Sequence, residues 1–168
     1  MKRRFVILDR DGTLNVDRHY LSDPNDLELL PGVCRGLRRL QALGMGIIVV
    51  TNQSGVARGI LDRARLTEIH ARLKAMLFAQ GIKLDGIYVC PHHPAEGCRC
   101  RKPATGLVEQ AVFHHGFDPG TSFVIGDRDS DIDCGRNLGA FTILVRTGQG
   151  EEERYAGKIR PNAICDDL

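Results

Sequence analysis

The sequence predicts an α/β protein with a Rossmann-like parallel sheet flanked by helices. Three observations carry this prediction: short runs of apolar residues recur along the chain, segments with helical spacing separate them, and polar residues follow the runs directly. Continuous short apolar runs are typical of strands buried on both faces. Strands that alternate with helices imply right-handed crossovers and a parallel sheet. The 168 residues suffice for one core, so we expect a single domain over residues 1–168.

The first expected strand is Phe5–Leu8, which is apolar throughout. Residues 14–31 are polar and rich in turn formers. Val33–Leu43 then has apolar residues at helical spacing, and Gly44 is placed to end that helix. This first unit therefore predicts a strand, a long irregular segment and a helix.

The next unit repeats the alternation. Ile47–Val50 is a second apolar run and a second expected strand. Asp62 is a suitable N-cap for a helix to about Gln80, because leucines, isoleucine and methionine recur on one face. Gly86–Val89 is the third expected strand.

The second half of the chain contains further strands and helices. A loop over residues 91–103 is rich in Cys, His, Arg and Pro. Two helices are expected at Thr105–His115 and Asp131–Leu138, and two strands at Ser122–Ile125 and Thr142–Val145. The tail from Gly148 is polar, and a short strand is expected at Ala163–Cys165.

Composition excludes several classes of protein. Hydrophobic residues make up 42% and charged residues 26%, and the net charge is only +2, which gives no indication of nucleic-acid or anionic-lipid binding. The basic start Met1–Arg4 resembles the beginning of a signal peptide, but the apolar run behind it is too short for one. No stretch approaches the roughly 18 apolar residues of a membrane span. We expect a cytoplasmic monomer that binds neither nucleic acid nor membrane.

Polar residues stand where the predicted strands end. Asp9 follows the first strand, Thr51 the second, Cys90 the third and Asp127 the fourth. In parallel α/β sheets the functional site lies at the carboxyl ends of the strands. These residues are therefore expected to lie around one site.

The first strand leads into the motif Asp9-Arg10-Asp11-Gly12-Thr13. Alternation along a strand starts Asp9 and Asp11 on one side, and Gly12 permits a sharp turn. Two carboxylates so close need a cation between them, and Mg²⁺ prefers oxygen ligands. One carboxylate would attack phosphorus while the other moves a proton. A polar turn would explain a lone pair of aspartates, but it explains the complete motif after four apolar residues less well.

A second cluster contains metal-binding residue types. Cys90, His92, Cys98 and Cys100 have the composition of a tetrahedral zinc site, with His93 as the competing imidazole. Four protein ligands would make it a closed, structural site. The segment offers no core of its own, so a metal would supply its stability. A reactive or fortuitous cysteine cluster is the alternative.

The remaining cysteines are scattered. Cys34, Cys134 and Cys165 fall in expected helices or strands, and we expect free buried thiols there. Spacings of the C-x-x-C kind, common in redox sites, are missing from the sequence, which speaks against a redox or metal sensor.

The chain resembles the haloacid dehalogenase superfamily over nearly its whole length. The D-x-D-G-T motif, Thr51, a basic Lys102 before a helix and the segment Gly126–Asp131 occur in the superfamily's order. The resemblance implies a capless phosphatase domain with a zinc-binding loop at 90–103. It also implies that Asp9 forms a phospho-aspartate and that Asp11 protonates the leaving oxygen and then activates water.

Further roles follow from the same resemblance. Thr51 and Lys102 would hold the phosphoryl oxygens, and Mg²⁺ would be held by Asp9, the backbone carbonyl of Asp11, and Asp127. These groups match phosphoryl transfer, which needs positioning and charge compensation. Asp131 would orient Lys102 or a metal-bound water, or would simply be a carboxylate favoured at a helix N-terminus.

Within the superfamily, the loop ending in Cys98-Arg99-Cys100-Arg101-Lys102-Pro103 resembles the branch of the heptose bisphosphate and histidinol-phosphate phosphatases. The segment Thr51–Gly59 favours the heptose side. That resemblance implies removal of the 7-phosphate from D-glycero-D-manno-heptose 1,7-bisphosphate, in the synthesis of nucleotide-activated heptose. The residues expected to contact this small phosphorylated sugar are Asp17, Arg18, His19, Tyr20, Asn52, Gln53, Ser54, Arg101 and Arg128.

Two other functions remain open from the sequence. One is a histidinol-phosphate phosphatase, which the short spacing between His92 and Cys98 permits. The other is a zinc-stabilised binding module without catalysis, which would leave an unsubstituted catalytic motif idle.

Overall fold

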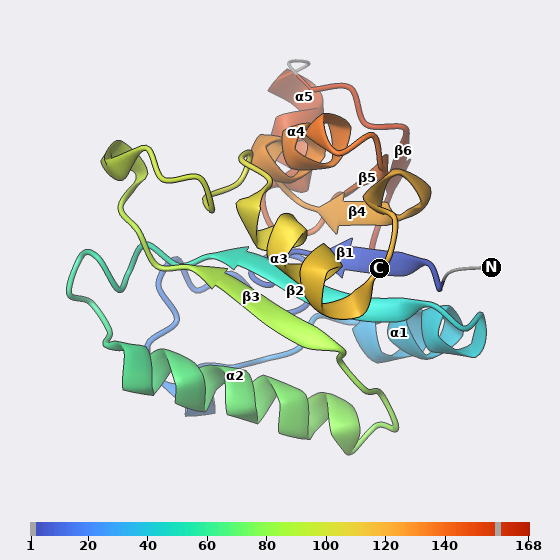
Figure 1. Ribbon diagram of the computed structural model, residues 1–168. Coiled ribbons are helices and arrows are strands. Elements are labelled where there is room, and N and C mark those ends of the chain that lie inside the picture. Colours follow the sequence, from blue (N-terminus) through green and yellow to red (C-terminus); the bar gives the residue numbers. More distant parts are fainter. Residues whose placement is uncertain (1–2, 157–158) are drawn as a thin grey trace.

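The apolar runs form one six-stranded sheet in the computed structural model, which describes residues 3–156 and 159–168 (Figure 1). The strands are β1 Phe5–Leu8, β2 Gly46–Asn52, β3 Gly86–Cys90, β4 Phe123–Gly126, β5 Phe141–Val145 and β6 Ala163–Cys165. Their order is β3-β2-β1-β4-β5-β6 and all neighbours pair in parallel. The predicted α/β fold class is confirmed. Met1 and Lys2, part of the basic start, lie outside the described residues.

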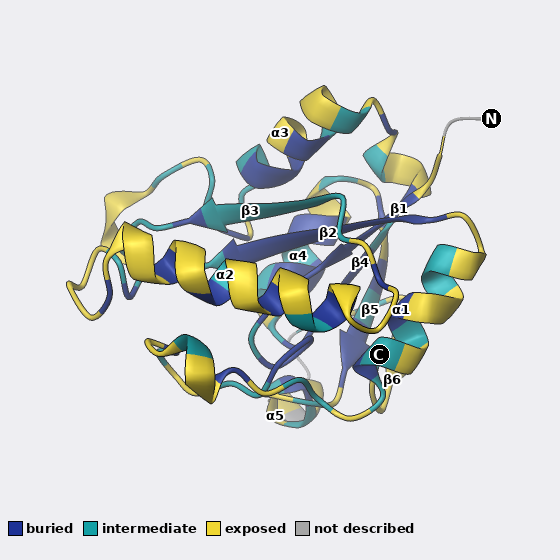
Figure 2. Ribbon diagram, turned by 90° about the horizontal axis from the view of Figure 1, so that it is seen from below, coloured by how far each residue is buried: buried dark blue, intermediate teal, exposed yellow. Residues whose placement is uncertain are grey.

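Helices cover both faces of the sheet. They are α1 Val33–Ala42, α2 Arg63–Phe78, α3 Gly106–His115, α4 Asp129–Asn137 and α5 Gly150–Ala156, with single 3-10 turns η1 Pro24–Asp26, η2 Pro94–Glu96 and η3 Pro119–Thr121. Apolar residues of α1 and α2 pack with one set of strand side chains, and those of α3 and α4 pack with the alternate set. Figure 2 shows the exposed outer surfaces of α1 and α2 against the buried strands behind them.

The helix boundaries follow from capping chemistry. Asp62 caps α2 as predicted, since its carboxylate accepts a hydrogen bond from the Arg65 N–H at 2.7 Å. Helix α4 begins at Asp129 instead of Asp131, because Asp131 bonds back to the Arg128 N–H at 3.1 Å. Helix α5 was not predicted, because its sequence has no apolar spacing.

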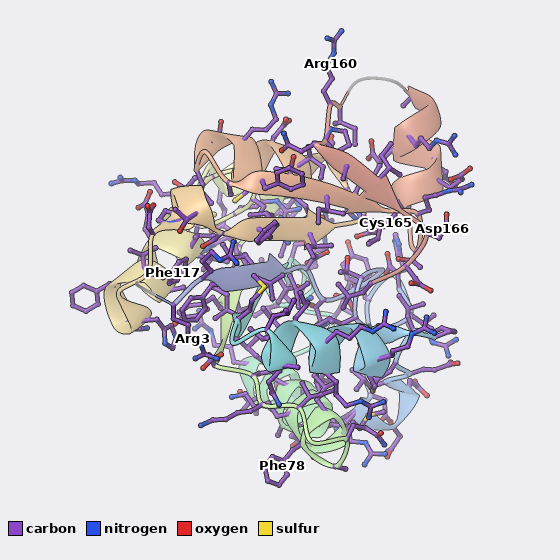
Figure 3. The ribbon with its side chains drawn as sticks, turned by 90° about the vertical axis from the view of Figure 1, so that its right-hand side faces the viewer. Arg3, Phe78, Phe117, Arg160, Cys165 and Asp166 are labelled. Atoms are coloured by element: carbon purple, nitrogen blue, oxygen red, sulfur yellow. The ribbon has the colours of Figure 1, made fainter. Side chains whose placement is uncertain are left out.

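The isolated cysteines differ from expectation in one case. All six cysteines are free, and Cys134 is buried and Cys34 partly buried. Cys165 is exposed, so the prediction of a buried thiol is wrong there. The reason is its place on β6, which lies at the edge of the sheet beside β5 (Figure 3).

The order of the strands creates a place for a site beside β1. The chain passes outward from β1 to β2 and β3, and then returns to β4 on the other side of β1. Crossovers on the two sides of such a switch point leave a crevice at the carboxyl ends of the strands. The Asp9 N–H extends the ladder into this crevice by donating to the Ile125 carbonyl at 3.0 Å. Asp9 therefore leaves β1 at the switch point.

Among the described residues, no helix is both long enough and apolar enough to cross a membrane.

Candidate active site

A pocket of about 350 Å³ lies at the carboxyl ends of the strands. Most residues that the sequence placed in the site line it: Asp9, Asp11, Asp17, His19, Tyr20, Thr51, Asn52, Gln53, Ser54, Arg101, Lys102 and Arg128. Two residues predicted for this site do not line it: the exposed guanidinium of Arg18 pairs with Glu28 at 2.8 Å, and Asp127 is fully buried.

Lys102 reaches the carboxylate of Asp9 from the loop that follows β3. Its Nζ lies 2.7 Å from Asp9 Oδ1, 2.7 Å from Asp131 Oδ1 and 2.6 Å from the Val50 carbonyl. Burial lowers the pKa of Lys102, but Asp131 and Asp9 outweigh it, so the net pKa is raised and the ammonium stays charged. Burial raises the pKa of Asp9 to about 6 despite the opposing charge of Lys102. A buried cation thus already faces the predicted nucleophile.

Asn52 fixes the backbone of Lys102. Its Oδ1 accepts from the Lys102 N–H at 3.1 Å, and its Nδ2 donates to the Lys102 carbonyl at 3.2 Å. Asn52 was predicted to contact substrate. Its side chain lines the pocket, and both polar ends of its amide bond to the Lys102 backbone, so Asn52 also positions a neighbour of the reacting groups.

Asp131 combines two of the tasks considered for it. Its Oδ1 forms the ion pair with Lys102, and its Oδ2 accepts the Arg128 N–H at the start of α4. The residue is almost completely buried. It therefore orients Lys102 and caps the helix with the same carboxylate.

Asp127 fits into a space made by two glycines. Gly12 and Gly148 both have positive φ, at 81° and 57°, and a Cβ at either position would overlap Asp127 Oδ2. The Gln149 N–H donates to this oxygen at 2.9 Å. Burial, and then the charges of Asp9 and Asp131, raise the pKa of Asp127 to about 8.

The buried carboxylates fit a divalent cation. One oxygen from each of Asp9, Asp127 and Asp131 lies within 4.8 Å of the others. Hard oxygen donors and concentrated negative charge suit Mg²⁺. Because both oxygens of Asp131 already accept protein donors, Asp9 and Asp127 are the better candidates for metal ligands.

Asp11 is held by three side chains. The Arg10 guanidinium lies 2.7 Å from its Oδ2, Asn15 donates to Oδ1 at 2.9 Å, and Gln53 donates to Oδ2 at 2.7 Å. Burial raises the pKa of Asp11, but Arg10 and the hydrogen bonds from Asn15, Arg10 and Gln53 outweigh it and lower the pKa. Gln53 also lies 2.8 Å from the Thr51 hydroxyl, which connects two of the predicted catalytic residues.

The outer wall of the pocket carries opposite charges. Arg128 forms an ion pair with Asp17 at 2.8 Å. Asp17 also accepts a hydrogen bond from the His19 N–H at 2.8 Å. The ring centroids of His19 and Tyr20 lie 4.8 Å apart in an edge-on arrangement. Within the part of the chain that the structure describes, the buried Nη1 of Arg101 has no hydrogen-bond partner. A buried donor of this kind calls for an acceptor from a ligand or from water.

The Cys/His cluster extends along the same loop, from Cys90 at the end of β3 to Cys100, two residues before Lys102. The sulfur of Cys90 is 3.5 Å from that of Cys98, which is 3.5 Å from that of Cys100. His92 Nδ1 lies 3.6 Å from Cys90 and 3.2 Å from Cys100. A tetrahedron with zinc–sulfur bonds of about 2.3 Å has sulfur–sulfur edges of about 3.8 Å, so the four atoms fit a zinc ion. The competing imidazole, His93, accepts the N–H of Ala95 at 3.2 Å.

Several site residues were missed in the sequence. Arg10 and His70 stand behind Asp11, and the pocket is also lined by Leu21, Arg58, Pro94, Asp129, Ser130 and Gln149. The position of Ser130 beside the aspartates of Gly126–Asp131 was a usable indication. Arg10 stands between the two predicted aspartates and Asp129 lies within Gly126–Asp131, whereas His70 and Leu21 come from distant segments that only the fold brings together.

Comparisons with known proteins agree with this geometry. Residues 99–168 match the model of the family described as "HAD-hyrolase-like". The D-glycero-beta-D-manno-heptose-1,7-bisphosphate 7-phosphatase of Pseudomonas aeruginosa is 39% identical, over 100% of this chain and 95% of its own length. The enzyme of the same name from Pasteurella multocida is 35% identical, over 99% of this chain and 93% of its own length.

A solved structure agrees as well. The D,D-heptose 1,7-bisphosphate phosphatase from B. bronchiseptica, crystallised with magnesium and phosphate, is 33% identical with a TM-score of 0.92, covering 98% of this chain and 93% of its own. Full-length relatives of this identity, a common fold and the D-x-D site lead to one conclusion. The chain belongs to the haloacid dehalogenase-like hydrolases, in the family of the D-glycero-beta-D-manno-heptose-1,7-bisphosphate 7-phosphatases.

Proposed function

We propose that this protein is a magnesium-dependent phosphatase that removes the 7-phosphate of D-glycero-D-manno-heptose 1,7-bisphosphate through a phospho-aspartate at Asp9. The observation that carries the proposal is the arrangement around Asp9: a buried carboxylate at the strand end, a charged lysine 2.7 Å away and a second held carboxylate, Asp11. The names of the relatives supply the substrate and favour it over histidinol phosphate. A non-catalytic binding module does not fit a hydrolase family.

The chemistry requires two steps on one carboxylate. In the first, an oxygen of Asp9 forms a bond to phosphorus, the bond from phosphorus to the sugar oxygen breaks, and Asp11 gives that oxygen a proton. In the second, a water oxygen bonds to phosphorus, the bond to Asp9 breaks, and Asp11 takes the proton of the water. Asp11 ends as it began, so one water is consumed for each phosphate released.

The resting state of Asp11 needs an added step. Its lowered pKa leaves it ionised in the free protein. An entering phosphate group brings negative charge close to this carboxylate, which raises the pKa and favours uptake of the proton that the first step consumes.

The basic groups of the pocket would bind the phosphoryl oxygens. Lys102 contacts Asp9, the Thr51 hydroxyl belongs to the same pocket, and Arg101 and Arg128, which also line it, would bind the second phosphate of a bisphosphate. The unpartnered Nη1 of Arg101 supports an anion at that position. Asp17, His19 and Tyr20 would meet the sugar, with Gln53 and Ser54 nearby.

Two metals complete the proposal. Asp9, Asp127 and the backbone carbonyl of Asp11 would hold Mg²⁺, which supplies positive charge opposite the transferring phosphoryl group. Cys90, His92, Cys98 and Cys100 would hold a structural Zn²⁺ that fixes the loop carrying Arg101 and Lys102. Metal analysis of protein grown with adequate zinc should find about one zinc per chain.

We further infer that the protein works in the cytoplasm as a monomer. Six free cysteines support a reducing compartment. Size-exclusion chromatography with light scattering tests the monomer.

A phosphate-release screen tests the substrate. It compares the α and β anomers of the heptose bisphosphate with histidinol phosphate, at equal concentrations and with added Mg²⁺. We expect the highest kcat/KM for a heptose bisphosphate. A higher value for histidinol phosphate would overturn the substrate assignment but leave the chemistry intact, and absence of turnover for all three would overturn both.

A further inference from the structure

Behind Asp11 lies a buried arginine that none of the proposed steps uses. Arg10 has 0% exposure, although arginine is seldom buried without a specific partner. Its guanidinium covers both oxygens of Asp11, with Nη2 at 2.9 and 2.7 Å and Nε at 3.2 and 3.1 Å from Oδ1 and Oδ2. A planar fork of this kind restricts both the position and the rotation of the carboxylate.

The remaining end of the guanidinium is held from helix α2. Arg10 Nη1 lies 3.0 Å from His70 Nε2, across 60 positions of sequence. Guanidinium nitrogens only donate, so Nε2 must be the acceptor and the proton of the ring must be on Nδ1. Burial, and then the charge of Arg10, lower the pKa of His70 to about 3, which agrees with a neutral ring. His70 therefore accepts from Arg10 in its ordinary charge state.

Stability alone does not explain why Arg10 is buried between Asp11 and His70. A buried ion pair is often no better for stability than apolar side chains of similar volume. What the pair does provide is a fixed orientation for Asp11, the carboxylate that faces the pocket. Small displacements of a reacting group lower rates strongly, so such an orientation has a kinetic value.

We propose that Arg10, itself oriented by His70, is a positioning residue that holds the Asp11 carboxyl group in line with the leaving oxygen and the attacking water. This inference rests on the proposed function. It assigns no contact with substrate to either residue, and it makes α2 part of the support of the site.

If Arg10 positions Asp11, the loss of rate in Arg10 variants should depend on the leaving group of the substrate. A sugar phosphate needs a proton from Asp11 in the first step, whereas p-nitrophenyl phosphate releases a stable phenolate that needs none. Loss of Arg10 should therefore slow phosphorylation of Asp9 by the sugar phosphate, while the first step with p-nitrophenyl phosphate stays close to wild type. The second step requires water activation by Asp11 and should slow for both substrates.

Two histidine variants provide the main test, because they leave the buried arginine in place. His70→Met removes the acceptor at similar volume, and His70→Gln keeps an acceptor oxygen near the position of Nε2. We expect His70→Met to lower kcat for the heptose bisphosphate about tenfold with little change in KM, and His70→Gln to recover most of the loss. Arg72→Met, an exposed change two positions further along α2, is the matched control.

Arg10 variants separate orientation from charge. Arg10→Lys keeps the positive charge but loses the fork, so we expect its kcat to remain at least tenfold below wild type. Circular dichroism and a thermal melt establish that each variant is folded. Single-turnover measurements with the two substrates then give the rate of the first step separately.

The outcomes are distinct. A His70→Met variant with the kcat of wild type, or an Arg10→Lys variant that slows the first step equally for both substrates, would overturn the positioning role while wild-type activity upholds the proposed function. A wild-type protein that forms no phospho-aspartate and hydrolyses neither substrate would overturn the proposed function and, with it, this inference.

Discussion

Asp9 is the residue on which the proposed chemistry depends most directly. Asp9→Asn replaces the attacking oxygen with an amide that is a poor nucleophile, and we expect turnover to fall at least a hundredfold, or about 2.7 kcal/mol of barrier. The fold should persist, since the amide retains the size of the side chain. Steady-state rates and a thermal melt check both statements. A variant with more than about a hundredth of the wild-type rate would contradict covalent catalysis by Asp9.

An Asn52 variant tests whether the hydrogen bonds that hold the Lys102 backbone are needed for activity. Asn52→Ala removes both hydrogen bonds to the Lys102 backbone. We expect a loss of about tenfold to a hundredfold in kcat/KM, because Lys102 would lose its fixed distance from Asp9. Ser54→Ala, which removes only a hydroxyl from another pocket-lining side chain, is the comparison. Equal, small losses of kcat/KM in both variants would contradict a positioning role for the hydrogen bonds from Asn52 to Lys102.

At the scale of single residues, the sequence predicted most of the side chains that line the pocket but not all of their contacts. The positions of Asp9, Asp11 and Lys102 followed from strand ends and motif order. The direction of Arg18 did not, because its pairing with Glu28 depends on how residues 14–31 fold back. Nor did the contact between Arg10 and His70, since nothing in the spacing of α2 marks a histidine beside its buried face.

The loop between β3 and α3 is the first element with a testable role. Cys98→Ala or Cys100→Ala should release zinc, lower the phosphatase rate by about a hundredfold and speed proteolysis within residues 91–103, because Lys102 and Arg101 would lose their support. Lys102→Ala is the control: it should lose a similar rate and keep its zinc and protease resistance. Far-ultraviolet circular dichroism should be unchanged in all three.

The loop's connection to the active site would be refuted by one result. A cysteine variant that contains no zinc, yet hydrolyses the substrate at the wild-type rate, would separate the cluster from the placement of Lys102.

The turn after β5 is a second such element. Gly148→Ala places a methyl group against Asp127 Oδ2, so we expect the apparent affinity for Mg²⁺ to fall about tenfold. Gly81→Ala is the matched control: it has a similar φ of 74° and nothing within 4 Å of its Cβ, so it carries the backbone strain alone. Gly81→Ala should lose about 1 to 2 kcal/mol of stability from strain alone, and Gly148→Ala should lose more, because its Cβ also overlaps Asp127 Oδ2 and the Gly12 Cα. Equal magnesium affinity in the two would refute the contact.

Elements were predicted well where burial dictates the pattern. Strands β1 and β2 are buried over almost their entire length, and their continuous apolar runs predicted them. Helix α5 was missed because its stability does not come from an apolar face: three glutamates stand in its first turn, where the helix dipole favours them.

For the whole molecule, the buried carboxylates predict that magnesium stabilises the fold. Zinc-bound, magnesium-free protein should gain about 2.7 kcal/mol at a hundredfold excess of Mg²⁺ over its dissociation constant, which is about 5 to 10 °C in Tm. Asp127→Asn should remove most of this gain, since the variant has lost a proposed ligand. Differential scanning calorimetry measures both. The same gain in Asp127→Asn would place the ion elsewhere.

The loop after β3 has an exposed turn in its middle and is fixed to β2 at its end. Residues 94–97 are exposed, and a Cβ at Gly97 meets nothing within 4 Å. At that end, Arg101 alone separates Cys100 from Lys102, whose backbone is bonded to Asn52. Chain length should therefore vary freely in one part of the loop and hardly at all in the other. An inserted residue after Ala95 would leave the lysine in place, whereas one after Cys100 would shift its register against β2.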